Sequence, residues 1–195
     1  MTRSLLMFLI SMLVFSIPSF SQETENAADP EKVARDAFEA AIGSAVQKCD
    51  SAKKILDEEV DIKTKKKNEK IAYKLYEEAV KDYLIANEID PNSYTVHFNL
   101  AMTYVKLGDY KKAIPSFTKA IYIDSTQNDA YRERALARIC KGEFDLAVKD
   151  LDTAININFD DYEAFYQRGF LKETAKDKSI AIADYDSAIE IKPDF

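Results

Sequence analysis

The sequence contains no tryptophan, one histidine and two cysteines among its 195 residues. These few side chains leave little material for metal sites of histidine and cysteine, or for catalytic pairs of a nucleophile and a base. Only four glycines and five prolines are present, and a β architecture rich in turns usually needs more of both. The composition therefore favours a helical protein and offers no support for an enzyme.

Positive charge is also scarce, since 27 lysines and arginines face 34 aspartates and glutamates, for a net charge of −7. Domains that bind nucleic acid are usually basic, so we expect no nucleic-acid partner. A charged fraction of 31% excludes a chain that lies mainly in a membrane, and a hydrophobic fraction of 47% argues against a fully disordered one.

The one long hydrophobic run lies near the N-terminus, from Leu5 to Ile17. It follows a single arginine and precedes the small residues Ser19 and Ser21, which is the pattern of a secretory signal peptide. The run is shorter than the roughly 20 residues that span a bilayer. We therefore expect residues 1–21 to be removed and the protein to be periplasmic or secreted, without further membrane contact. An uncleaved anchor is the alternative.

Residues 22–30 are polar and without periodicity, and they predict a flexible leader that ends with Pro30 in the first turn of a helix. Export would place Cys49 and Cys140 where disulfides persist. Their positions predict helices that are not neighbours, so we expect two free, partly buried thiols. An internal disulfide is the alternative.

Most of the chain repeats with a period of 34 residues, so that Gly108-Asp109-Tyr110 recurs as Gly142-Glu143-Phe144. A further set recurs at the same period, consisting of an alanine, a large apolar residue and a second alanine: Ala79, Tyr83, Ala86; Ala113, Phe117, Ala120; Ala147, Leu151, Ala154; and Ala181, Tyr185, Ala188. Steps of four and three residues are helical. Each unit therefore predicts a hairpin of two helices.

Local signals support the hairpins. Gly108 can end a first helix in the left-handed conformation, and Asp109 can cap the second helix. Pro115 lies in the second turn of that helix, where we expect a slight kink and no break. His97 lies where a large side chain would pack, and we expect it in the core.

These residues resemble the tetratricopeptide repeat, closely over residues 94–127, 128–161 and 162–195. The resemblance implies an all-α fold, namely a right-handed superhelical stack of helix hairpins, and a non-catalytic scaffold that binds protein. The last unit has Ala175-Lys176 where the family usually has Leu-Gly, so we expect its turn to differ in detail.

Residues 31–93 fit the repeat less well, because lysines occupy apolar places in the expected first helix. An apolar helical stripe upstream supplies another partner: Phe38, Ile42, Ala45, Cys49, Ala52 and Leu56. We therefore predict a long N-terminal helix over 31–57, paired with a helix over 70–89. The charged stretch 57–70 is interpreted as a solvated tip. The alternative is a basic surface for an acidic partner or lipid headgroups.

Two acidic pairs, Asp150 with Asp152 and Asp184 with Asp186, also recur at the period. Residues two apart on a helix do not face each other, so we expect these side chains to be solvated and to bind no metal. The scattered glycines form no phosphate-binding loop, and we expect no cofactor.

Stacked helix hairpins have a concave surface lined by the first helix of each unit. Eleven side chains on those helices lie off the packing stripe and are the candidate groove residues: Phe98, Asn99, Met102, Lys106, Asp129, Arg132, Glu133, Leu136, Tyr166, Gln167 and Phe170. This mixture of apolar and charged groups suits another protein or peptide. Some family members hold a chaperone's terminal carboxylate with basic residues; here Asp129 and Glu133 would repel it.

The sequence therefore predicts an exported, non-catalytic scaffold of the cell envelope that binds another protein. One alternative is a structural assembly subunit that self-associates through helix 31–57 or through an uncapped C-terminal end. The helix over 178–192 has more apolar residues than one buried face requires, so we expect part of it to stay exposed. An enzyme or a small-molecule carrier is the third alternative.

Overall fold

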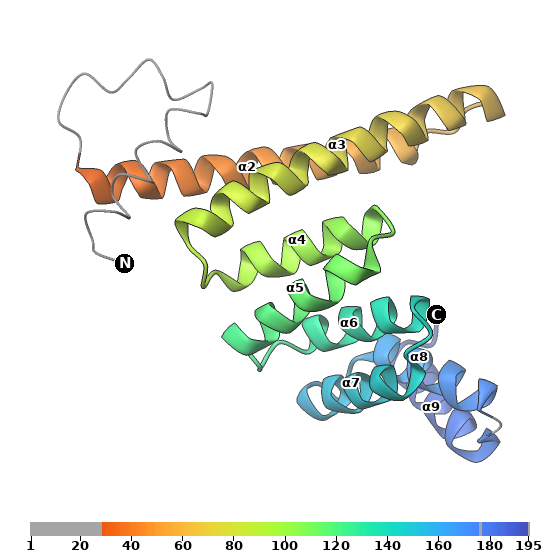
Figure 1. Ribbon diagram of the computed structural model, residues 1–195. Helices are drawn as coiled ribbons and strands as arrows, with labels where there is room; N and C mark the ends of the chain where they lie inside the picture. Colours follow the sequence, from red (N-terminus) through yellow and green to blue (C-terminus); the bar gives the residue numbers. More distant parts are fainter. Residues whose placement is uncertain (1–28, 176, 195) are drawn as a thin grey trace. The chain divides into compact units, whose positions relative to one another are not determined.

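A computed structural model describes residues 29–175 and 177–194. These residues form eight α-helices and no strand, which confirms the predicted all-α fold (Figure 1). The helices are α2 (Pro30–Leu56), α3 (Ile62–Ile89), α4 (Tyr94–Lys106), α5 (Tyr110–Ile123), α6 (Asn128–Cys140), α7 (Phe144–Ile157), α8 (Tyr162–Thr174) and α9 (Lys178–Ile191). The predicted signal peptide over 1–21 and most of the leader over 22–30 lie outside the described residues.

The chain divides into two compact units, one that extends through Val96 and one that starts at His97. In the first unit, α2 and α3 form a long hairpin. Helix α3 begins eight residues before the predicted 70–89, at Ile62, because Asp61 caps it and accepts hydrogen bonds from the backbone N–H groups of Lys63 and Thr64. Most of the lysine-rich stretch is therefore helical.

Alanines fill the contact between α2 and α3. The buried residues of the hairpin are Ala37, Ala41, Ala45, Ala52, Ala72, Tyr76, Ala79, Tyr83 and Ala86. Small side chains let the two helix backbones approach closely, and the tyrosines fill the remaining volume. Of the predicted apolar stripe of α2, Ala45 and Ala52 are buried in this hairpin, Phe38, Ile42 and Cys49 are half-buried, and Leu56 is exposed.

The second unit stacks α6 on α7 and α8 on α9, and α7 also packs on α8. Gly108 and Gly142 end first helices with φ of +73° and +77°, a conformation that glycine adopts without strain. The same backbone bond closes all three turns, since the N–H groups of Asp109, Glu143 and Asp177 donate to carbonyls five residues earlier. The third turn keeps this bond although its sequence has Ala175-Lys176 in place of Leu-Gly.

The core of the second unit is built mainly from alanines and branched aliphatic residues of α6, α7 and α8: Ala135, Ala147, Leu151, Ala154, Ile155, Ala164 and Leu171. Helix α5 continues through Pro115 without a break, as expected. His97 is buried, in agreement with a packing role.

The prediction that the repeated aspartates are solvated is wrong for Asp150 and Asp184, whose residues are only 4% and 3% exposed. Arg134 donates two hydrogen bonds to Asp150, at 2.9 and 2.6 Å, and Arg138 donates a third at 2.5 Å. Arg168 holds Asp184 with two bonds of 2.9 and 2.6 Å. These arginines lie on the first helix of each hairpin and cover a face of the second helix that its own pattern marks as exposed.

Replacing Asp150 with Asn is expected to lower the free energy of unfolding by about 3 kcal/mol, because two buried guanidinium groups lose their counter-charge. The exposed Asp145, on the same helix, is the control, and Asp145→Asn is expected to cost less than about 1 kcal/mol. Chemical denaturation measures both variants. Equal stabilities for the two would show that the buried ion pairs do not hold the hairpin.

Candidate protein-binding groove

The candidate groove residues lie on α4, α6 and α8, the first helices of the three hairpins, and we call the surface formed by these eleven residues the groove surface. On α4, Lys106 is exposed, and Asn99 and Met102 are half-buried. Phe98 is half-buried because its ring packs edge-on against Phe117 of α5, with ring centres 5.8 Å apart. Part of that side chain therefore belongs to the hairpin core.

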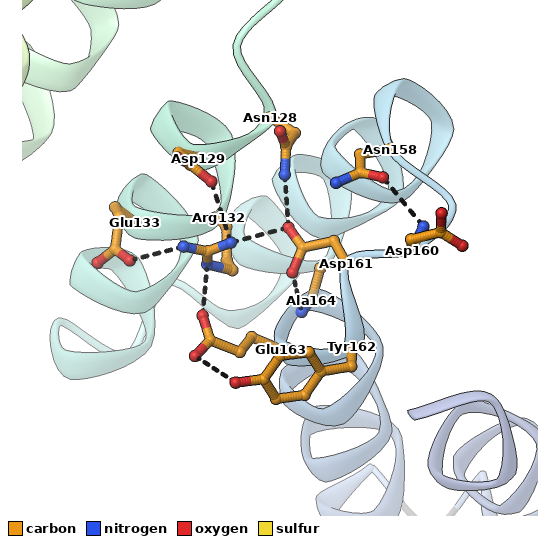
Figure 2. Close-up of polar contacts among 10 residues, drawn as sticks. All are labelled: Asn128, Asp129, Arg132, Glu133, Asn158, Asp160, Asp161, Tyr162, Glu163 and Ala164. Atoms are coloured by element: carbon orange, nitrogen blue, oxygen red, sulfur yellow. Dashed lines mark hydrogen bonds and ion pairs between the residues drawn. The ribbon is translucent and has the colours of Figure 1, made fainter. Parts of the chain in front are cut away.

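Arg132 is the centre of a polar network that joins α6 to α8, which Figure 2 shows. Its Nη1 atom lies 3.1 Å from Asp129 and 3.0 Å from Asp161, and its Nη2 atom lies 3.4 Å from Glu133. Its Nε atom lies 3.2 Å from Glu163. The network brings together Asp129, Arg132 and Glu133, three of the predicted groove residues.

Asp161 is a member of this network that is not among the predicted groove residues. It caps α8 by accepting a hydrogen bond from the backbone N–H of Ala164, and its other oxygen accepts one of 2.7 Å from Asn128. Its place just before a helix is a capping signal, but a cap alone does not predict an ion pair with a side chain 29 residues earlier.

The network is acidic, because one guanidinium faces four carboxylates and three negative charges remain in excess. Burial raises the pKa of Glu133 above its usual range, although Arg132 acts in the opposite direction. For Arg132, burial opposes the charged form, but the charge and hydrogen bond of Asp161 raise its pKa overall. The network therefore keeps a fixed cation at its centre and would attract a further one.

Helix α8 adds an apolar part to the groove surface. Tyr166 and Phe170 lie one turn apart and are 44% and 47% exposed. Gln167, between them, has a buried Oε1 atom that accepts no hydrogen bond from the described residues. On α6, Leu136 is half-buried. Exposed rings beside fixed charges are typical of surfaces that bind peptides.

The other features that the sequence predicts concern its cysteines, possible metal ligands and the hydrophobicity of its helices. Cys49 is half-buried and Cys140 is exposed, and no disulfide joins them, so the expected thiols are present but only Cys49 is partly buried. Within residues 29–175 and 177–194, no cluster of three or more histidine, cysteine or acidic side chains has the arrangement of a metal site. In that same part of the chain, none of the helices has the length and hydrophobicity needed to span a bilayer.

Comparison with protein families gives two matches to the tetratricopeptide repeat, over residues 94–127 and 162–195. Comparison with curated protein sequences gives no significant match. Among solved structures, the crystal structure of MamA is 28% identical, with a TM-score of 0.60 over 71% of this chain and 78% of its own.

Two similar structures are described by their peptide binding. YrrB, a repeat protein with an unusual peptide-binding site, is 19% identical, with a TM-score of 0.60 over 90% of this chain and 91% of its own. The second tetratricopeptide repeat domain of human RPAP3, in complex with an HSP70 peptide, is 21% identical, with a TM-score of 0.53 over 69% of this chain and 98% of its own. At these identities the likeness concerns the fold.

Glu133→Gln is expected to raise the melting temperature at pH 7. A carboxyl whose pKa is raised by folding stabilises the folded state most when it is protonated, and that stability is lost as the pH rises through the folded pKa. Gln imitates the protonated form, so its advantage should disappear below about pH 4, where both proteins carry a neutral group. Thermal melts between about pH 4 and pH 7 measure this difference in melting temperature, with Glu190→Gln at an exposed position as control. A destabilised Glu133→Gln at pH 7 would contradict the burial argument.

Proposed function

Because this chain is a tetratricopeptide repeat protein, we propose that it is a non-catalytic scaffold whose groove surface holds a basic segment of another protein. The observation that carries this proposal is the network around Arg132, which leaves three negative charges on α6 and α8. The exposed rings of Tyr166 and Phe170 supply apolar contact area beside that charge.

The charge of the groove surface argues for a ligand that differs from the RPAP3 ligand. The peptide bound to human RPAP3 is SGPTIEEVD, which ends in acidic residues and a carboxylate. In this chain such a tail would meet Asp129, Glu133 and Glu163, and like charges placed together cost binding energy. A segment with lysine or arginine beside an apolar anchor fits both parts of the surface.

The salt bridges around Arg132 also prepare the surface for binding. Arg132, Glu133 and Asp161 have side chains only 15%, 16% and 3% exposed. Their positions are set before a ligand arrives, so less side-chain entropy is lost on association than with free surface charges.

Two peptides that differ only in charge test the proposal: one has lysines around a central leucine and tyrosine, and the other has glutamates at the lysine positions. We expect the lysine peptide alone to bind, with an affinity that falls as salt rises. Phe170→Ala should weaken it by about tenfold, the loss typical of an aromatic contact. The control is Phe144→Ala, since Phe144 is similarly exposed but lies on the second helix of a hairpin. Fluorescence anisotropy measures the affinities.

Preferential binding of the glutamate peptide would contradict the acidic groove. An equal loss for Phe144→Ala and Phe170→Ala would show that the peptide does not use α8.

We also propose that the scaffold works in the cell envelope, on the basis of the signal-like pattern over residues 1–21. The exported protein is expected to begin at Gln22, and mass spectrometry of the N-terminal peptide of protein from the periplasm or medium measures this directly. Protein that retains Met1 and fractionates with the cytosol would contradict export, and would leave the binding proposal unaffected.

A further inference from the structure

Helix α9 has an apolar face that no described helix covers. Ile182 and Ile189 are 60% and 55% exposed. Beside them lies an open hollow of about 580 Å³, lined by Tyr166, Glu173, Tyr185, Ala188 and Ile189. The rings of Tyr166 and Tyr185 are 5.7 Å apart, and the Tyr185 hydroxyl donates to Glu173. We call Ile182, Tyr185, Asp186, Ile189 and this hollow the end face.

The same face is covered one repeat earlier. Tyr185 corresponds to Leu151, which is fully buried, and Ile189 corresponds to Ile155, which is buried as well. Leu151 and Ile155 lie in one core cluster with Ala164 and Leu171 of the following helix, α8. The end face therefore has the residue pattern of a surface that receives the first helix of a further hairpin.

An arginine accompanies that packing in both earlier repeats. Arg134 of α6 donates to Thr118 of α5 at 3.0 Å, and Arg168 of α8 donates to Asp152 of α7 at 2.8 Å. Positions 118, 152 and 186 correspond in the 34-residue register. Asp186 is exposed and makes no ion pair with any described residue, so the third position offers a carboxylate without its arginine.

We propose that the end face is a docking site for an amphipathic helix of another protein, which places an arginine on Asp186. Helices α6 and α8 define the pattern of such a helix, an alanine and an aromatic followed by an arginine and then a small or apolar residue: Ala130, Tyr131, Arg134, Ala137; and Ala164, Phe165, Arg168, Leu171. The docked helix has the same spacing, with the apolar residues against Ile182 and Ile189.

A second folded copy does not supply this helix from the described residues. The patterned faces of α6 and α8 are already buried in their own stack. Helix α2 has Ala41 where the arginine should follow its Ala37-Phe38 pair, and α4 has Leu100 at the position of Arg134. We therefore assign the docked helix to a different protein, and the experiment below tests a second copy as the alternative. The end-face proposal uses other residues than the acidic network, so it does not depend on the proposed groove ligand.

The probe is a peptide with the sequence of residues 161–174, capped at both ends and used with the full chain. We expect saturable binding by isothermal calorimetry. Asp186→Asn in the protein and the Arg168→Gln change in the peptide should each weaken it by about tenfold, the loss expected for one charge-assisted hydrogen bond. Combining the two changes should weaken it little further, since both remove the same contact. Ile189→Lys should abolish binding.

Matched controls separate the end face from general effects of charge. Asp145→Asn removes an exposed carboxylate of α7, and Leu84→Lys places a charge on an exposed leucine of α3. Both should bind the peptide as the unchanged protein does. Circular dichroism checks that Ile189→Lys keeps its helical content. If Ile189→Lys unfolds, Asp186→Asn still tests the proposal.

Three results would overturn the proposal. The first is no binding of the peptide by the unchanged protein. The second is a loss for Asp152→Asn with none for Asp186→Asn, which would mean that the peptide displaces α8 from its own site. The third is self-association in sedimentation velocity that Ile189→Lys abolishes, which would assign the end face to a second copy. Binding of the lysine peptide, and its loss in Phe170→Ala, test the groove surface separately. Failure of the end-face proposal can therefore be distinguished from failure of the proposed function.

Discussion

Close contact between helices through alanine is the constraint on which each unit depends. In the first unit alanines separate α2 from α3, and in the second unit they recur where successive helices cross. A methyl group at these places lets backbones approach so that a tyrosine, phenylalanine or leucine one turn away fills the gap. The 34-residue period is the repetition of this contact, and it sets where every other side chain lies.

Arginine side chains add ion pairs and hydrogen bonds between the helices that pack through alanines. Arg134 and Arg168 each bind an aspartate within their own hairpin and also reach the preceding one. Arg132 instead reaches the start of α8, in the following hairpin. Each of these guanidinium groups is partly buried with its carboxylates, so its loss would leave unpaired charge in a site of low polarity. The arginines therefore fix the spacing of hairpins more strictly than apolar packing alone.

The helices could be predicted because their causes are local: the alanine spacing, the turns at Gly108 and Gly142, and Pro30 at the first helix. The burial of Asp150 could not, since its cause is an arginine 16 residues away on another helix. A helical wheel reports only which side of its own helix a residue lies on. For the same reason the groove residues could be assigned to helices, whereas the network around Arg132 needed Asp161, which precedes α8.

Tyr166 lies in both of the proposed binding surfaces. It belongs to the groove surface, and its ring also lines the hollow of the end face against Tyr185. A helix docked on the end face would restrict this ring, and a ligand in the groove would then lose less side-chain entropy on binding. Such linkage is reciprocal, so a groove ligand would favour the docked helix to the same degree. Two surfaces that each combine a carboxylate with apolar side chains thus share one aromatic ring.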